Sequence, residues 1–435
     1  MASNLKPLCK FGEKCYRKNP QHLNDFRHPK RKSEEEDEPE TKKRQKVQQE
    51  GKKKTIDDFF GHTKKQQPTE VNDEEDRAEN PSDSGAEDSG EDTGSAGACR
   101  GNSEEEKEGE EEEEVEAPDS PADVKENIRA KFLVDMPGDF YQFWDFCKAE
   151  NPHKPCDALK DLGFQLVGPF DILAGNHKGK TKNQHGKRPN FLLHWRYYYD
   201  PPEFQTLIKG DDSSQFHLGY FRDDPSEMPA FVASNSAAVD CIISSKGDNL
   251  FAAVNCCLEE QLKSKDTDSS KKAMLKSLAE KLKKFAGEKG HSLDVKSKGM
   301  KDRDKHVVCK SFHKAGIVVP VDENEVGYRE VPETPADLKK IFKKIADSKS
   351  EAERDMNYEP LQELITLIQF ANDECDYGEG LELGMDLFCY GGKVFHSTIL
   401  QLLPLAYMLL NRNEFGKIIE AHLKNRQKSA DLSQL

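Results

Sequence analysis

The chain has 435 residues, of which 65 are Lys or Arg and 81 are Asp or Glu, so its formal net charge at pH 7 is -16. This length favours two or three domains. One uniform globule is excluded, because residues 29–125 hold almost no aliphatic side chains, whereas residues 126–435 can bury a substantial core. No apolar run reaches the roughly 18 residues of a membrane span, and residues 1–15 lack the apolar segment of a secretory signal. We therefore expect a soluble intracellular protein with no membrane partner, whose 11 cysteines are free thiols or metal ligands.

A cluster of metal-ligating residues lies near the N-terminus, with the spacing C-x5-C-x6-H-x5-H over Cys9, Cys15, His22 and His28. Two thiolates and two imidazoles form a complete tetrahedral set for zinc, and such a closed set is structural rather than catalytic. Because so short a segment has no core, zinc must supply the free energy of its folding. The spacing leaves no room for a base-contacting helix, so a DNA-reading finger is disfavoured. The sequence predicts a small Cys2His2 zinc finger over residues 5–30.

The residues between these ligands closely resemble the poly(ADP-ribose)-binding zinc finger, including the Tyr-Arg pair after the second cysteine. The resemblance implies that the finger binds chains of ADP-ribose. Phe11 and Tyr16 offer aromatic faces on which adenine can stack, and Arg17 offers a guanidinium group for phosphate. We expect these three residues to form the binding site.

A disordered linker is expected over residues 31–125. Two basic clusters at its start, residues 29–32 and 42–46, resemble a bipartite nuclear-import signal. A solvated charged linker is the alternative, and nearby acidic residues disfavour nucleic-acid binding. Residues 103–116 contain ten glutamates, whose mutual repulsion and lack of apolar area predict disorder. This acidic tract is either a surface for basic partners such as histones or a solubilising spacer.

A short segment with the apolar residues Ile56, Phe59 and Phe60 interrupts an otherwise polar stretch of the linker. In a disordered stretch such residues stay exposed or dock on a partner. Their pattern resembles the motif that binds the sliding clamp, although Lys53 stands where that motif has Gln. The sliding clamp is therefore a candidate partner, and a chance match is the alternative.

The folded region begins with mixed elements. An aromatic run at residues 140–146, preceded by Pro137 and Gly138, indicates a helix start, and apolar residues on one face predict a helix over residues 270–288. Strand composition between turn-forming residues predicts strands at residues 191–199, 216–222 and 249–254.

Later elements are helical. Thr334 followed by Pro335 has the N-cap and first-turn residues of a helix start. A further helix is expected from about Pro360 to Asn372, and one or two helices are expected over residues 396–424, kinked or entered at Pro404. Strands followed by helices indicate an α+β protein with two packed subdomains, which we place at residues 126–268 and 269–435.

Three carboxylates, those of Asp373, Glu374 and Asp376, cluster where the helix that begins near Pro360 should end. They face the negative end of the helix dipole and one another, which would raise a carboxylate pKa and suit a general base. An exposed acidic turn is the alternative, and calcium is a further option without an EF-hand loop. The glycines that begin at Gly378 do not match G-x-G-x-x-G, so we expect no nucleotide loop there.

Residues from about 129 to 425 resemble the histone PARylation factor family, the accessory proteins of poly(ADP-ribose) polymerases in DNA-damage signalling. The similarity is carried by GFQLVGPFDILAG (163–175), WRYYYDPPEFQT (195–206), GYFRDDP (219–225), VGYRE (326–330) and QFANDECDYGEGLELGMDLFCYG (369–391). The finger is an added module relative to shorter family members, and the long acidic linker is a second departure.

This resemblance implies an active site shared with the catalytic domain of a polymerase. The polymerase holds NAD, and the chain contributes Glu374 as the general base that deprotonates a substrate serine. The implied partner-contact residues are Tyr328, Arg329, Asp373, Phe370 and Asp386.

The leading interpretation is thus a nuclear cofactor, at chromatin near DNA damage, that directs ADP-ribose to serines of histones and other proteins but is not an enzyme alone. In the second interpretation the chain is a scaffold that reads poly(ADP-ribose) and binds histones without a catalytic contribution. The third, an autonomous transferase or hydrolase, is disfavoured because no NAD site is recognisable in the sequence.

Overall fold

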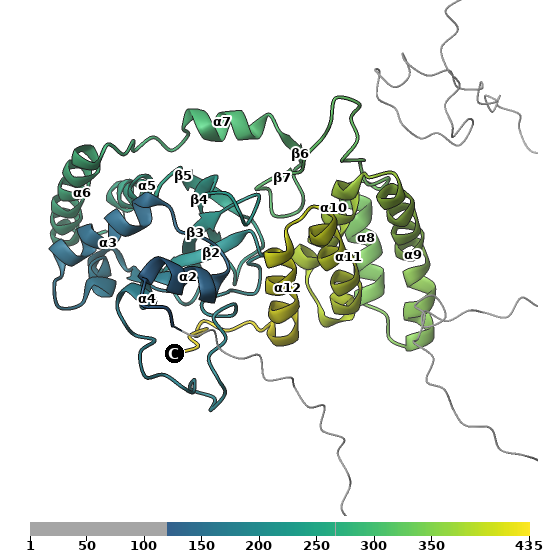
Figure 1. Cartoon of the computed structure of the whole chain (residues 1–435), viewed down its shortest axis with the longest axis horizontal. Coiled ribbons are helices and arrows are strands. Elements are labelled where there is room, and N and C mark those ends of the chain that lie inside the picture. The colour runs from purple at the N-terminus through teal and green to yellow at the C-terminus, as the bar shows by residue number, and fades with distance from the viewer. Residues whose placement is uncertain (1–119, 266) are drawn as a thin grey trace, which may run out of the picture. The chain divides into compact units, whose positions relative to one another are not determined.

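The computed structural model describes residues 120–265 and 267–435 (Figure 1). The predicted zinc finger, import signal, clamp motif and acidic tract all lie outside these residues. Within them, no helix is both long enough and apolar enough to cross a membrane. The eight described cysteines are free thiols.

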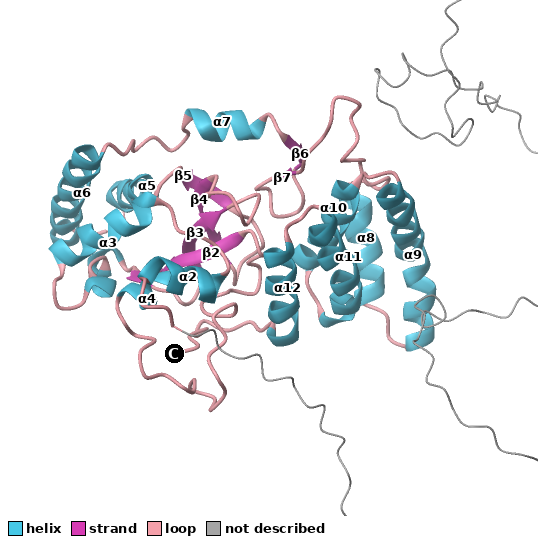
Figure 2. Ribbon diagram, viewed as in Figure 1, coloured by secondary structure: helices cyan, strands magenta, loops and turns pink. Residues whose placement is uncertain are grey.

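The first half of the described chain packs helices against one sheet of five strands (Figure 2). The strands are antiparallel and follow one another in sequence order, with the pairs Gln165–Lys209 and Phe216–Ser236 in register. Their bounds are β1 Gln165–Leu166, β2 Phe204–Lys209, β3 Phe216–Phe221, β4 Phe231–Ser236 and β5 Ser244–Gly247. The helices are α2 Val124–Phe132, α3 Gly138–Glu150, α4 Pro169–Leu173, α5 Leu250–Lys263 and α6 Ser269–Lys289.

A core rich in phenylalanine forms the interior of this half. The rings of Phe140 and Phe170 stack with their centroids 4.3 Å apart, and Phe143 meets Phe251 edge to face at 5.1 Å. Leu275 of α6 belongs to the same core. Because α6 begins directly after residue 268, the helix that follows the predicted subdomain boundary packs on the elements that precede it. The boundary itself stays a prediction.

The second half is almost entirely helical. It begins with α7 Lys298–Asp304 and the two-stranded ribbon of β6 Val307–Cys309 and β7 Ile317–Val318. Five helices follow and gather in one group (Figure 1). They are α8 Pro335–Ala346, α9 Glu351–Asp373, α10 Tyr377–Tyr390, α11 His396–Leu409 and α12 Asn413–Asn425. Their apolar faces share a second core, of which Leu364, Leu387 and Leu403 are members.

Several predicted elements are confirmed. The helix expected at residues 140–146 is part of α3, residues 216–222 contain β3, and α6 covers residues 270–288. The hydroxyl group of Thr334 accepts from the backbone N–H of Asp337 and caps α8, whose first residue is Pro335. Mixed strands followed by helices confirm the α+β class.

Two predicted strands are wrong. Residues 191–199 form a series of turns rather than a strand, and Trp195 has a left-handed φ of 56°. Phe191, Trp195 and Tyr197 are nevertheless buried, so this composition reflects burial and not strand pairing. Residues 249–254 begin α5, because the side chain of Asn249 caps the helix by accepting from the N–H of Ala252 at 3.0 Å.

Helix boundaries also differ. Helix α9 starts at Glu351, well before Pro360, because the Ser350 side chain caps it there. Pro360 lies inside α9 on its exposed side, where the helix tolerates a residue without a backbone N–H group. Residues 396–424 form two helices, which is one of the two arrangements expected, and Pro404 lies within the first.

Candidate functional site at the junction of α9 and α10

The turn between α9 and α10 holds the predicted acidic cluster. Asp373 is the last residue of α9, Glu374 is its C-cap, and Asp376 directly precedes α10. The backbone N–H groups of Glu374 and Asp376 both donate to the carbonyl oxygen of Ala371, at 3.0 and 2.9 Å. Cys375 has a left-handed φ of 66°, the backbone conformation that commonly ends a helix. The carboxylates are therefore carried by a well-bonded turn.

The guanidinium group of Arg329 pairs with two of these carboxylates. Its Nη2 atom lies 2.8 Å from Oδ2 of Asp376 and forms a second ion pair with Oε2 of Glu374. The side chains of Arg329 and Asp376 are buried, whereas that of Glu374 keeps 15% of its exposure. A buried charge is stable only when it is paired, so these ion pairs fix the orientation of a carboxylate that still reaches solvent.

Close backbone contacts bring Arg329 to this turn. The Oδ1 atom of Asp376 accepts from the N–H of Gly327 at 3.0 Å, and the N–H of Gly378 donates to the carbonyl of Gly327 at 2.9 Å. A Cβ atom at Gly378 would lie 2.9 Å from Cδ2 of Tyr328. Glycine at position 378 therefore permits the segment 327–329 to lie against the start of α10.

Tyr328 extends the same contact along α10. Its hydroxyl group donates to Oε2 of Glu382 at 2.9 Å. Burial raises the pKa of Tyr328, as does the negative charge of Glu382. Burial also raises the pKa of Glu382, while the hydrogen bond from Tyr328 opposes that rise. The Tyr328 hydroxyl group is thus a hydrogen-bond donor that holds the segment 327–329 against the second turn of α10.

Glu379 lies between these contacts, in the first turn of α10, and is 1% exposed. Burial raises its pKa to about 8, against the attraction of Arg329 and with the help of repulsion from Asp376 and other carboxylates. Glu379 was not among the three carboxylates for which the sequence predicted a raised pKa.

Asp386 lies two turns further along α10 and is also 1% exposed. Its Oδ1 atom accepts from the hydroxyl group of Ser311 at 2.5 Å and from the N–H of Phe312 at 2.8 Å. Burial raises its pKa to about 7 although both hydrogen bonds oppose the rise. Asp386 thus fixes the loop between β6 and β7 against α10.

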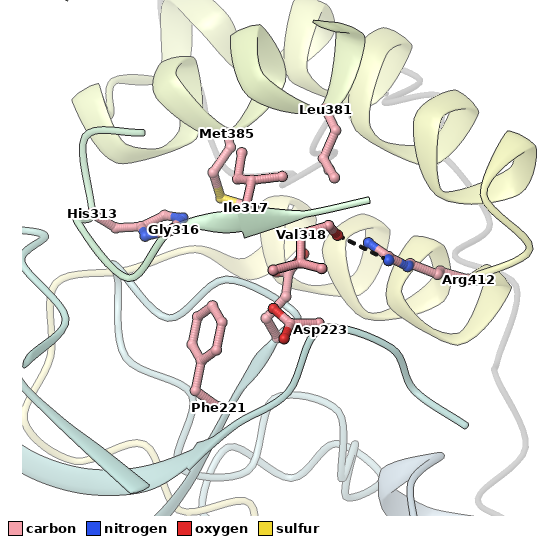
Figure 3. Close-up of a pocket in the computed structure, with 10 residues that line it drawn as sticks. Phe221, Asp223, His313, Gly316, Ile317, Val318, Leu381, Met385 and Arg412 are labelled. Carbon is pink, nitrogen blue, oxygen red and sulfur yellow. Dashed lines mark hydrogen bonds between the residues drawn. The ribbon is translucent and has the colours of Figure 1, made fainter. Parts of the chain in front are cut away.

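The opposite side of α10 lines a small cavity next to β7 (Figure 3). Its walls include Leu381 and Met385 of α10, and the Arg412 side chain donates to the carbonyl oxygen of Val318 at 3.0 Å. The cavity measures about 10 Å³, which is room for about one water molecule. It is far too small for a nucleotide.

Comparisons with known proteins show to which family the chain belongs. A family model described as Histone PARylation factor 1 matches residues 123–426. This chain belongs to the histone PARylation factor 1 family. The histone PARylation factor 1 of Bos taurus is 54% identical over 318 residues, which cover 73% of this chain and 90% of the relative. That of Mus musculus is 54% identical over 312 residues, 71% of this chain and 88% of the relative, and that of Danio rerio is 51% identical over 314 residues, 72% and 88%.

A second family model, described as a PBZ domain, matches residues 6–31 of this histone PARylation factor 1 family member. The predicted finger and its type are thereby confirmed. Its donor set of two thiolates and two imidazoles fits structural zinc. Within residues 120–265 and 267–435, no group of three or more His, Cys, Asp or Glu side chains is arranged to hold a metal ion.

Among the site residues expected from the family resemblance, the structure brings Tyr328, Arg329 and Glu374 together. Asp373 is exposed beside Glu374, and Phe370 is 56% exposed one turn earlier on α9. These two residues form a rim of the turn that a partner can reach. Contact of Arg329 or Asp386 with a partner stays a prediction, but Arg329 pairs with carboxylates of its own chain and Asp386 is buried.

Sequence reasoning gave no role to Glu379 or Glu382 in this family member. A signal was nevertheless present, because the acidic residues at 376, 379, 382 and 386 recur at the spacing of one helix face. An acidic stripe on a helix usually faces solvent. Here it faces inward, towards Arg329, Tyr328 and the Ser311 loop.

Proposed function

We propose that this chain is an accessory factor of an ADP-ribosylating polymerase, whose active site it completes by supplying Glu374 as a general base for serine. The observation that carries the proposal is the orientation of Glu374, fixed by buried Arg329 and still partly exposed. The names of the relatives, which join histones to PARylation, support it. The exposed rim of Phe370 and Asp373 gives a polymerase catalytic domain a surface to dock on.

The chemistry asked of Glu374 is the removal of one proton. A serine hydroxyl is a poor nucleophile until a base takes its proton, and such a base contributes roughly 10²–10⁴ in rate. NAD held by the polymerase would supply the ADP-ribosyl group. The role of this chain is to hold an ionised carboxylate beside the hydroxyl group. Arg329 fixes the direction in which that carboxylate points, because its guanidinium group forms an ion pair with Oε2 of Glu374.

The zinc finger would then retain the factor where poly(ADP-ribose) already exists. In this proposal Cys9, Cys15, His22 and His28 bind zinc, and Phe11, Tyr16 and Arg17 bind the chain. Such a factor would act in the nucleus at damaged chromatin, with histones as substrates. The sliding clamp remains a candidate partner through Ile56, Phe59 and Phe60.

The decisive experiment combines the full chain with polymerase, broken DNA, NAD and a histone peptide bearing serine. Glu374→Gln should reduce serine modification by at least about 100-fold. Glu363→Gln, an exposed glutamate on the same helix α9, is the matched control and should behave as the wild type. Serine modification that survives Glu374→Gln contradicts the assignment of the base.

The alternative interpretations give different results in the same assay. A scaffold that only reads poly(ADP-ribose) would be insensitive to Glu374→Gln but would lose function when Tyr16 and Arg17 are both replaced by alanine. An autonomous enzyme would modify the peptide without polymerase. Under our proposal the double substitution abolishes binding to the chain of ADP-ribose, leaves the zinc content unchanged and spares peptide modification in solution.

A further inference from the structure

The loop that follows α4 carries a strongly basic surface that the proposed mechanism does not use. Residues 172–199 contain no Asp or Glu, although the whole chain has a formal net charge of -16. We call residues 177–188 the basic loop. All of its Lys and Arg side chains are exposed, namely Lys178, Lys180, Lys182, Lys187 and Arg188. A block of positive charge attracts anions to its own part of the surface, even on a chain that is negative as a whole.

Hydrogen bonds close the far end of the basic loop into a turn. Oδ1 of Asn183 accepts from the backbone N–H groups of His185 and Lys187, at 2.9 and 3.1 Å. The N–H of Asn183 in turn donates to the carbonyl oxygen of Lys187 at 2.7 Å. Because the backbone is already ordered, the cations that it carries lose less conformational entropy when they bind a ligand.

Two side-chain contacts attach the basic loop to the rest of the fold. Nδ2 of Asn183 donates to Oε1 of Gln434 at 3.2 Å, which places the turn beside the C-terminus (Figure 1). At the start of the loop, His177 is buried, and its Nε2 atom lies 3.4 Å from Nδ2 of Asn127 in α2. The fold therefore holds the loop at its start and near its far end.

The nearest carboxylate that precedes the loop in sequence is occupied by other groups. Asp171 is buried, its Oδ1 atom accepts from Asn176 at 2.7 Å, and its Oδ2 atom lies 2.9 Å from Nε2 of His194. Behind the start of the loop, the buried Lys131 donates to Oδ1 of Asn127 at 2.6 Å and adds a further positive charge. The surface is therefore suited to a polyanion.

The residue types of the loop favour one class of polyanion. No Phe, Tyr or Trp occurs in residues 174–190, so the loop offers no aromatic face on which an unstacked base or adenine can lie. Duplex DNA keeps its bases stacked and presents about one phosphate charge per 1.7 Å of its axis. The side chains of Thr181 and Gln184 are exposed as well and can donate to phosphate oxygens.

We propose that the basic loop binds the phosphate backbone of duplex DNA without reading its sequence. The chain then contacts DNA directly, a role that goes beyond the proposed supply of a general base. The basic clusters of the linker differ from this loop, because acidic residues lie close to them in sequence.

The test measures binding of the full chain to a short fluorescent DNA duplex by anisotropy, between about 50 and 200 mM salt. Lys180→Gln combined with Lys182→Gln should weaken binding by at least about tenfold at the middle of this range. The slope of log K against log salt should become shallower by about 2, since each phosphate contact contributes about 0.9. Lys276→Gln combined with Lys298→Gln removes the same charge from exposed positions on α6 and α7 and should change the affinity less than about twofold.

Several results would overturn the assignment of DNA binding to this loop. Equal losses in the two double variants would show that only the net charge matters, and a wild-type chain that does not bind the duplex at about 50 mM salt would remove the surface altogether. A loop variant that binds poly(ADP-ribose) more weakly but duplex DNA normally would show that the loop takes a different polyanion. Glu374→Gln should bind the duplex as the wild type does, which separates a failure of DNA binding from a failure of the proposed base.

A second measurement needs no substitution and so does not depend on the folding of a variant. Duplex DNA should protect Lys180 and Lys182 of the wild-type chain from chemical acetylation, whereas exposed Lys276 on α6 should react as it does without DNA. Mass spectrometry of the digested chain measures the protection. Equal acetylation of all three lysines with and without DNA contradicts the contact.

Discussion

The hydroxyl group of Tyr328 donates a hydrogen bond to Oε2 of Glu382 at 2.9 Å, across a separation of 54 residues. This contact fastens the segment that carries Arg329 to the helix whose first turn carries Glu379. Arg329 in turn contacts Glu374. The orientation of the proposed base thus depends on a chain of buried polar contacts between two parts of the sequence.

Loss of the Tyr328 hydroxyl group should therefore lower the stability of the protein and loosen the contacts that orient Glu374. Tyr328→Phe removes one of the donors to the half-buried Glu382, which we expect to lower the free energy of unfolding by about 0.5–1.5 kcal/mol. Urea denaturation at pH 8 measures this change. Tyr390→Phe, at the other end of α10, is the control and should lower stability by less. Equal losses in the two variants would show that the Tyr328 hydroxyl has no special role.

Asp376 should matter more for stability than its exposed neighbours. Asp376→Asn keeps an oxygen for the Gly327 N–H but removes the charge that pairs with buried Arg329, so stability should fall by about 1–3 kcal/mol. Asp376→Ala also removes the acceptor and should cost about 1–3 kcal/mol more. Thermal and urea unfolding give the order Asp355→Asn, Asp376→Asn, Asp376→Ala, from most to least stable. A result with Asp376→Asn as stable as Asp355→Asn, an exposed aspartate on α9, speaks against a structural ion pair.

Local signals in the sequence predicted the start of α8 and the extent of α6, whereas the caps of α5 and α9 were missed. Thr334 before Pro335 predicted the start of α8 because capping is a contact between residues close in sequence. The period of apolar residues likewise predicted α6. The aromatic run at 191–199 failed because burial of its rings is achieved in turns, and composition alone does not separate burial in turns from burial in a strand.

The site was predictable only in part. The sequence placed the acidic cluster at the expected end of a helix, and the family resemblance singled out Glu374 within this cluster. The pairing of Arg329 with Glu374 spans 45 residues, and no periodic pattern connects residues so far apart. The sequence also did not show that Glu379 and Glu382 face inward. Arg329, which attracts Glu379, and Tyr328, which donates to Glu382, both come from a segment far away in the sequence.

Asp386 should make stability depend on pH. Burial raises its pKa in the folded chain to about 7, from an ordinary value of 3.8 when unfolded. Between these values the folded state binds more protons, so its stability falls as pH rises from about 4 to about 7. Asp386→Asn keeps the oxygen that accepts from Ser311 and Phe312 but cannot titrate. The stability of this variant relative to the wild type should therefore improve by about 2 kcal/mol between pH 5 and pH 8.

Urea denaturation at several pH values tests this dependence. Other buried carboxyl groups, Glu203 among them, change equally in both proteins and cancel in the difference. Asp355→Asn should run parallel to the wild type at every pH. A constant difference between Asp386→Asn and the wild type would show that Asp386 is not protonated in the folded state.

Removal of one zinc ligand should affect only the finger. Cys9→Ser leaves three ligands for a four-coordinate ion, so the zinc content should fall well below the roughly one ion per chain expected for a structural site. Mass spectrometry of the metal and binding of poly(ADP-ribose) measure the loss. Cys256→Ser, a partly exposed free thiol on α5, should change neither. Full zinc content in Cys9→Ser would remove Cys9 from the ligand set.

A pair of glycine substitutions tests the contact between α10 and the segment 327–329. Both Gly378 and Gly287 lie in helices, where alanine is the better helix former by roughly 0.5–1 kcal/mol. A Cβ atom at Gly287 meets nothing within 4 Å, so Gly287→Ala should stabilise the protein by about that amount. A Cβ atom at Gly378 would lie 2.9 Å from the Tyr328 ring and 3.1 Å from the Gly327 carbonyl oxygen.

Gly378→Ala must therefore push away the segment that holds Arg329, and overpacking of this kind costs about 1–3 kcal/mol. We expect a lower midpoint of thermal unfolding and, because Arg329 moves with Tyr328, a loss of serine modification that Gly287→Ala does not show. Calorimetry and the histone peptide assay measure the two effects. If both glycine variants gain stability alike, the segment 327–329 is not packed tightly against α10, and Arg329 cannot orient Glu374 in the way that we propose.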